Sequence, residues 1–111
     1  MTVSSATQGG GTVPLAASGT RSKYLIRTLT DNVTSTLGNG TAGVAYTCTL
    51  EVRQDATGGR TIAFANTNIR LPYGAQPVLS TAPGAVDIIQ LLWTGPYWVV
   101  LCGATDIRVV P

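Results

Sequence analysis

The sequence contains no histidine and few charged residues. Its 111 residues include 7 basic and 5 acidic side chains, so charged residues make up 11% of the chain, against about 25% in an average domain. Without histidine, the chain lacks the commonest general base and the commonest metal ligand. Much of the surface must be built from neutral polar residues, which suits a domain that sits against neighbouring proteins.

Cysteine is also scarce. The chain has two cysteines, Cys48 and Cys102, and no CxxC motif, which excludes a Cys/His metal site. Each cysteine lies in an apolar run typical of a strand. This position favours two reduced thiols in the core over a disulfide, although the sequence leaves both possibilities open.

The motifs of common enzymes are missing as well. The five carboxylates are scattered and form no close pair, and there is no GxSxG motif for a serine nucleophile. The glycines at 9–11 and 58–59 are not followed by a helix that would turn them into a phosphate-binding loop. We therefore predict no catalytic residue, no metal site and no cofactor, and a protein that is not an enzyme.

No feature indicates binding to nucleic acid or a membrane. The net charge is +2 without a run of either sign, and Arg21, Lys23 and Arg27 alternate as on a solvated strand face rather than a phosphate-binding patch. The most apolar segment, Ile88–Trp93, is too short to span a bilayer as a helix. Because the first residues do not form a signal-peptide pattern, we expect synthesis and assembly in the cytoplasm.

The pattern along the chain predicts strands and no helix. Residues 1–20 are rich in Ser, Thr, Gly and Ala, which predicts an arm, either a disordered tail or one that becomes ordered on a neighbouring subunit. Tyr46–Arg53 alternates apolar and polar residues, whereas Val86–Trp93 is apolar on both faces and should be a central strand. Residues 21–111 are expected to form one all-β domain, an antiparallel β-sandwich of jelly-roll type. Strands are predicted over residues 23–30, 32–37, 46–53, 60–65, 86–93, 98–102 and 107–110. Turns are predicted between them at 38–40, 55–59, 72–74, 83–84 and 95–96, where Gly, Pro, Asn or Asp supplies the backbone conformation that a turn needs.

Three aromatic residues form the candidate interaction site. Trp93, Tyr97 and Trp98 surround the turn former Gly95-Pro96 near the tip of a predicted hairpin. Exposed rings could stack on sugars or dock a protein, whereas buried rings would fill the core or a subunit interface. Burial is the favoured interpretation, because most large aromatic residues in β domains are buried.

Three segments together resemble a known module. They are LEVRQDATGGRTIAF (50–64), LPYGAQPVLSTAPGAVDIIQL (71–91) and WTGPYW (93–98), and they resemble a β-rich module of tailed-bacteriophage virion proteins. The resemblance covers roughly residues 23–103, and it implies a β-sandwich that assembles as a homotrimer. It also implies that Gly58-Gly59 form a hairpin turn, that Asp87 anchors the start of the long apolar strand, and that Trp98 is a core residue.

The resemblance predicts a virion component but leaves two roles open. Tail fibres carry the module behind a long shaft, which is missing from this chain. We therefore expect a trimeric capsid decoration protein, which binds the major capsid protein or other virion proteins and stabilises the head shell. The alternative is a tail-fibre or receptor-binding tip that attaches to carbohydrate or protein on the host surface.

Overall fold

The protein is all-β, as the sequence predicts. The computed structural model describes residues 2–8, 22–35, 42–65, 68–103 and 105–107. Its strands are β1 (Thr2–Gln8), β2 (Ser22–Leu29), β3 (Val33–Ser35), β4 (Tyr46–Gln54), β5 (Ile62–Phe64), β6 (Ile69–Arg70), β7 (Val86–Trp93) and β8 (Trp98–Cys102). One short 3-10 helix, η1 (Pro72–Gly74), lies between β6 and β7.

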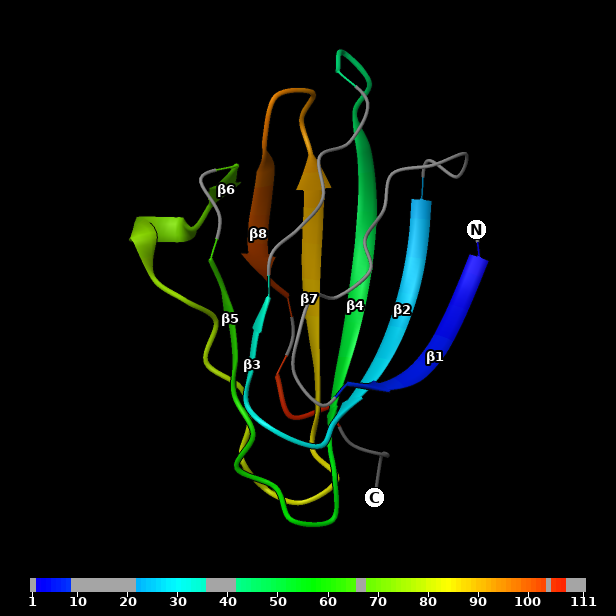
Figure 1. Cartoon of the computed structure of the whole chain (residues 1–111), viewed down its shortest axis with the longest axis vertical. Coiled ribbons are helices and arrows are strands. Elements are labelled where there is room, and N and C mark those ends of the chain that lie inside the picture. Colours follow the sequence, from blue (N-terminus) through cyan, green and yellow to red (C-terminus); the bar gives the residue numbers. More distant parts are fainter. Residues whose placement is uncertain (1, 9–21, 36–41, 66–67, 104, 108–111) are drawn as a thin grey trace.

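The strands form two sheets. A six-stranded sheet has the order β1-β2-β4-β7-β8-β6, and β3 pairs with β5 in a two-stranded sheet. The small sheet lies against one face of the large one, and the core fills the space between them (Figure 1). Its largest fully buried side chain is that of Trp98. Because the second layer holds only two short strands, a sandwich or jelly roll of the predicted kind is not confirmed.

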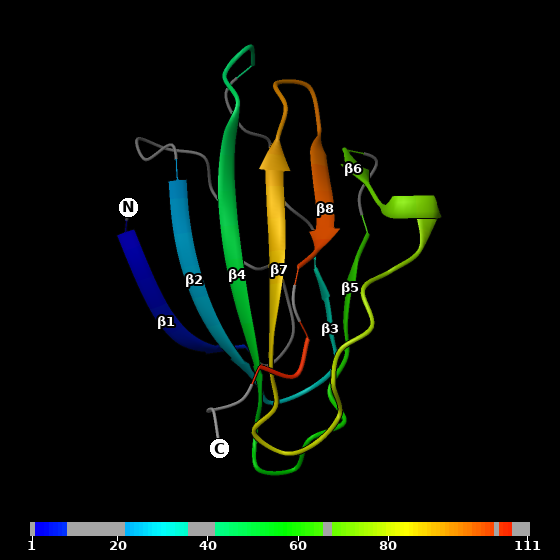
Figure 2. The same ribbon diagram turned by 180° about the vertical axis from the view of Figure 1, so that it is seen from behind.

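Strand β7 is central, as its apolar sequence predicts. It pairs with β4 on one side and β8 on the other. Its residues alternate strictly: Asp87, Ile89, Leu91 and Trp93 are buried, whereas the residues between them are half-buried or exposed. The buried side chains face the second layer. Among the described residues, no second layer of strands lies over the other face of the large sheet (Figure 2).

Cys48 is a buried thiol on this inner face, 2% exposed. It lies opposite Leu91 in the pairing of β4 with β7, so it fills the core as a small apolar side chain. The backbone of Cys102 ends β8, but its side chain lies outside the part of the chain that the structure describes.

The expected antiparallel arrangement is wrong. Of the six strand pairings among the described residues, β1–β2, β2–β4, β3–β5 and β6–β8 are parallel. Parallel neighbours need a crossover connection, and the chain provides one by running from β2 through β3 in the second layer before it enters β4 (Figure 1). A period of two assigns side chains to faces but does not set the strand direction, so the sequence pattern could not reveal these crossovers.

The sequence predicts that Arg21, Lys23 and Arg27 lie on a solvated strand face. This prediction is wrong for Arg27, whose exposed fraction is 4%. Arg27 alternates with Leu25 and Leu29 on the inner face of β2, and its Nη1 donates to the carbonyl of Ile26 at 2.8 Å. Arg21 and the side chain of Lys23 lie outside the described residues.

Part of the expected arm forms an edge strand. Residues Thr2–Gln8 pair in parallel with Lys23–Leu29 and extend the large sheet by one strand. Residues 9–21 lie outside the described part of the chain, so the division into an arm (1–20) and a domain (21–111) stays a prediction. The predicted turn at 38–40 and the end of the predicted strand 107–110 also fall outside it, and Ile107 itself is not in a strand.

A buried glutamine joins the two layers where β4 ends. Gln54 is 4% exposed. Its Nε2 donates to the carbonyls of Arg60, at 2.8 Å, and Ser80, at 2.9 Å, and its Oε1 accepts from the backbone N–H of Arg60 at 2.9 Å. Both ends of the carboxamide are thereby satisfied by backbone groups, as burial of a polar side chain requires.

Asp87, at the start of β7, likewise accepts hydrogen bonds from backbone groups of the connecting segments. Its carboxyl group, 3% exposed, accepts from the backbone N–H and the hydroxyl of Ser80 and from the backbone N–H of Asp106, at 2.6, 2.8 and 2.7 Å. Asp87 is therefore an anchor at the start of β7, as the resemblance implies.

The turn after β4 is closed by Asp55. Its Oδ1 accepts from the N–H groups of Thr57 and Gly58, and its Oδ2 lies 3.0 Å from Nη2 of Arg60. The hydrogen bond from Arg60 and that from the Gly58 backbone hold the pKa of Asp55 below its ordinary value. Gly58 and Gly59 both have positive φ, but the turn leads from one sheet to the other and is not a simple hairpin.

Gly58 and Gly59 provide a matched pair of substitutions. Both have φ near +70°, but a Cβ on Gly58 would lie 2.5 Å from the carbonyl oxygen of Thr81, whereas a Cβ on Gly59 would meet nothing within 4 Å. We expect Gly59→Ala to lower the free energy of unfolding by about 1 kcal/mol, from the left-handed backbone alone, and Gly58→Ala to lower it by at least about 2 kcal/mol more. Urea denaturation measures both values, and equal losses would contradict the role of the Thr81 contact.

The pKa of Asp55 predicts a pH dependence. Because this pKa is lower in the folded chain than the ordinary value near 3.9, Asp55 stabilises the fold above that value, and this contribution is lost as the pH falls through the folded pKa. We expect the stability difference between the wild type and Asp55→Asn to shrink between about pH 7 and about pH 3. Urea denaturation across this range measures it, and a difference independent of pH would contradict the assignment.

Candidate interaction surface

Two of the three aromatic residues predicted as a candidate site are in the core. Trp93 and Trp98 are 2% and 0% exposed. They face each other across β7 and β8 and pack edge to face, with ring centroids 5.4 Å apart and an angle of 61° between the rings. Their rings therefore fill the core, the interpretation that the sequence favoured, and neither is available to a ligand at the surface of a single chain.

Tyr97 is the half-buried member of the three. The guanidinium carbon of Arg70 lies 4.9 Å from the centroid of its ring, within the range of a cation–π interaction. The tip of the hairpin is closed by Thr94, whose N–H and hydroxyl both donate to the carbonyl of Tyr97. An interaction role for Trp93, Tyr97 and Trp98 stays a prediction. Of these three residues, only Tyr97 has exposed surface that could contribute to it.

A different tyrosine is the most exposed large side chain of the described residues. Tyr73 lies in η1 with φ 54, and its relative exposure is 106%. A positive φ is uncommon for residues other than glycine and costs about 1–2 kcal/mol, because Cβ approaches the neighbouring carbonyl oxygen. The turn is held by hydrogen bonds from the N–H of Gly74 to Leu71 and from that of Ala75 to Pro72. The backbone thus holds an aromatic ring in solvent.

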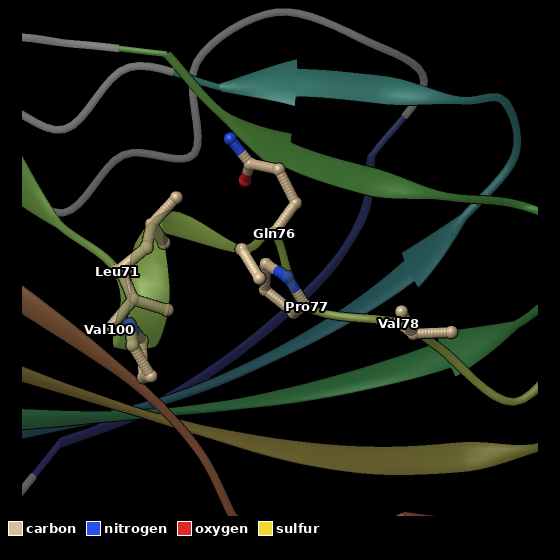
Figure 3. Close-up of a pocket in the computed structure, with 7 residues that line it drawn as sticks. Leu71, Gln76, Pro77, Val78 and Val100 are labelled. Carbon is tan, nitrogen blue, oxygen red and sulfur yellow. The ribbon is translucent and has the colours of Figure 1, made fainter.

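An apolar groove lies beside this turn. Its volume is about 290 Å³, and Figure 3 shows it between the segment that follows η1 and Val100 of β8. A cavity of about 150 Å³ can hold a benzene molecule, so the groove can accept a large apolar side chain. Val78 is 82% exposed. The lining residues are Leu71, Pro72, Ala75, Gln76, Pro77, Val78 and Val100.

Gln76, the polar side chain in this lining, already has hydrogen-bond partners within the chain. Its Oε1 accepts from the backbone N–H of Phe64 and its Nε2 donates to the carbonyl of the same residue, both at 2.8 Å. Figure 3 shows the amide turned away from Leu71 and Val100. The groove therefore offers apolar contact area and few hydrogen-bonding groups. We call residues Leu71–Val78 the Tyr73 loop.

The sequence identified Pro72-Tyr73-Gly74 as a turn but not as an interaction surface. The available signal was the aromatic residue between two turn formers, since turns lie at the surface. Within the described ranges, no group of three or more His, Cys, Asp or Glu side chains lies close enough together to hold a metal ion. No described helix has the length and apolar character needed to cross a membrane.

A family model favours one of the two virion roles. The family described as "Putative phage tail fibre C-terminal domain" matches residues 7–98, which cover most of the chain, including β2 to β7 and the whole Tyr73 loop. The chain belongs to this phage tail fibre domain family. No curated protein and no solved structure is significantly similar to it.

The family confirms the resemblance to phage virion modules. The tail fibre domain is a phage structural protein and a component of the virion. The match favours the tail-fibre alternative over the capsid decoration protein that the sequence placed first, and the decoration role is not confirmed.

The strained backbone at Tyr73 leads to a test of stability. Asparagine adopts positive φ more readily than tyrosine, and the exposed ring makes little contribution to the core. We expect Tyr73→Asn to raise the free energy of unfolding by about 0.5–1 kcal/mol, measured by urea denaturation. Tyr73→Ala should give no such gain, because alanine lacks the short polar side chain that lets asparagine form local hydrogen bonds in this conformation. A loss of stability in Tyr73→Asn would show that the ring supports the fold.

Proposed function

We propose that this tail fibre domain attaches the phage particle to the surface of its host, and that the Tyr73 loop makes the contact. The observation that carries the proposal is the full exposure of Tyr73 on a backbone conformation that disfavours tyrosine. Strained residues cluster at sites where the strain serves a function. The family of the domain supports the same proposal, because attachment to the host is the alternative role that the sequence indicates for a fibre tip.

The chemistry of the loop favours a protein receptor. Exposed tyrosine is enriched among residues that dominate binding energy at protein interfaces, and the groove beside it can accept an apolar side chain of a partner. A sugar would need several hydrogen-bonding groups, and the amide of Gln76 is already committed to Phe64. Binding to carbohydrate is the contrary outcome of the test below.

Other parts of the proposal concern assembly. Tail fibre modules of the kind this chain resembles are trimers, and we propose that this domain also assembles from several copies and joins other virion proteins. Several copies present several Tyr73 loops, so individually weak contacts with a surface that carries many receptors combine to give firm attachment.

Adsorption of the phage to host cells tests the proposal. The purified domain should compete with phage particles for adsorption, and Tyr73→Asn and Val78→Lys should each weaken this competition by at least about tenfold, because both remove apolar contact area. The matched control is Ala56→Lys, which adds the same charge at an exposed position in the β4–β5 turn, outside the Tyr73 loop and away from η1 (Figure 1). This control should compete like the wild type.

The cells can be treated to identify the receptor class. Protease treatment of the host cells should abolish binding of the domain, whereas periodate oxidation of surface sugars should leave it intact. The reverse result would identify a carbohydrate receptor. If neither Tyr73→Asn nor Val78→Lys differs from Ala56→Lys, the Tyr73 loop is not the contact surface.

A further inference from the structure

Arg70 is an exposed charge directly beside the Tyr73 loop. It ends β6, the edge strand of the large sheet, and is followed by Leu71, the first residue of the loop. Ile69 and Leu71, on either side of it, pack against the core. Because neighbouring side chains of an extended chain point to opposite sides, Arg70 points away from the core.

The ring of Tyr97 supports this charge. β6 pairs in parallel with β8, with Ile69 opposite Trp98, and the backbone N–H of Trp98 donates to the carbonyl of Asn68 at 2.8 Å. This pairing places Arg70 beside the residue that precedes Trp98, so its guanidinium carbon lies 4.9 Å from the centroid of the Tyr97 ring. The ring takes the face of the guanidinium group, whereas the N–H donors lie in its plane, where a carboxylate can accept two of them.

The elements around the Tyr73 loop carry one charge between them, and it is positive. Between Arg60 and Asp87 the only charged residue of the sequence is Arg70, and no charged residue occurs between Asp87 and Asp106. These stretches contain β5, β6, the Tyr73 loop, the β7–β8 hairpin and β8. A partner at this surface therefore meets a single positive charge next to an apolar groove, and charge complementarity favours a carboxylate on the partner.

The charge and the groove lie on the two sides of one edge of the molecule. Leu71 lines the groove, and its Cα lies about 3.8 Å from that of Arg70, as across any trans peptide bond. Among the described strands, β6 is the last on this side of the large sheet. Figures 1 and 2 both show η1, which carries Tyr73, projecting outward beyond β6. A partner segment that passes over this edge meets the groove, the ring of Tyr73 and Arg70.

We infer that Arg70 binds a carboxylate of the host receptor, next to the apolar side chain that the groove accepts, and that Tyr97 is the positioning residue for Arg70. The inference rests on the proposed function and names the chemistry of its partner, an exposed protein segment in which an Asp or Glu lies close to a large apolar side chain. Arginine suits this task better than lysine, because its planar group both lies over a ring and presents paired donors to a carboxylate.

Binding of the fluorescently labelled domain to host cells tests the role of Arg70. Arg70→Gln should raise the apparent dissociation constant by at least about tenfold, because it removes the charge from the contact. Arg70→Lys keeps the charge but loses the planar group, so its effect should be smaller. The matched control is Arg53→Gln, which removes the same charge at an exposed position on β4, where Arg53 is paired with Glu51. This control should bind like the wild type, and thermal melting checks that each variant is folded.

Salt dependence and a double-mutant cycle separate the roles of Arg70 and Tyr97. Binding of the wild type should weaken as NaCl rises from about 0.05 M to about 0.5 M, because salt screens the ion pair, and Arg70→Gln should depend less on salt. Tyr97→Leu should weaken binding by about threefold but keep the wild-type salt dependence, since the charge remains. In the Arg70→Gln background, Tyr97→Leu should have no further effect. A further loss there would overturn the positioning role of Tyr97.

Chemical treatment of the cells identifies the acidic group. Amidation of surface carboxylates with a carbodiimide and ethanolamine should reduce binding of the wild type to the level of Arg70→Gln, and binding of Arg70→Gln itself should not change. Protease-treated cells that still bind the wild type, but not Arg70→Gln, would place the carboxylate on a carbohydrate and overturn the protein partner.

Failure of this inference is distinguishable from failure of the proposed function. If Tyr73→Asn and Val78→Lys weaken attachment but folded Arg70→Gln binds like Arg53→Gln, the loop is the contact and the inference is overturned. If none of these variants differs from the wild type, both are overturned. Wild-type binding that does not change with salt would also overturn the inference, and this measurement does not depend on the folding of any variant.

Discussion

The buried carboxamide of Gln54 is the interaction on which the two-layer arrangement depends. After β4 the chain leaves the large sheet, turns, and enters the second layer as β5, so its backbone groups at this point lose the partners that a strand ladder would supply. A buried backbone group without a partner costs about 1–3 kcal/mol. Gln54 supplies partners to both the N–H and the carbonyl of Arg60 and to the carbonyl of Ser80. The side chain of Gln54 thus satisfies the backbone groups of two connecting segments, so both segments can lie at the edge of the core.

Asp87 fixes a third connecting segment, the one that follows β8, at the same end of the sheet. It binds Ser80 from one side and the backbone of Asp106 from the other, so the segment before β7 and the segment after β8 are fixed to the start of the central strand. Three parts of the pattern that carries the resemblance to phage modules, QD at 54–55, GG at 58–59 and VD at 86–87, belong to this junction. Folding is a sufficient explanation for these three parts of the pattern.

The sequence predicted those parts of the fold that depend on local signals. The bounds of β7 and β8 agree with the prediction because Pro83-Gly84 and Gly95-Pro96 mark the ends of their apolar runs. The strand directions could not be predicted, since the crossover through β3 depends on which layer a strand joins. The burial of Arg27 was missed for a related reason: alternation placed it with Leu25 and Leu29, but its charge suggested solvent. For the candidate site, the sequence located the turn at Tyr73, whereas the adjoining groove requires Val100 from a distant strand.

The conformation of Tyr73 is not explained by the stability of the fold. Gly74 follows it with φ 68, so the loop takes two consecutive residues through the left-handed region. Glycine or asparagine would allow this path at little cost, and tyrosine makes the path less favourable. A tyrosine that supported the fold would be expected to bury its ring, but this ring is fully exposed. We propose that the contact with the host surface offsets this cost.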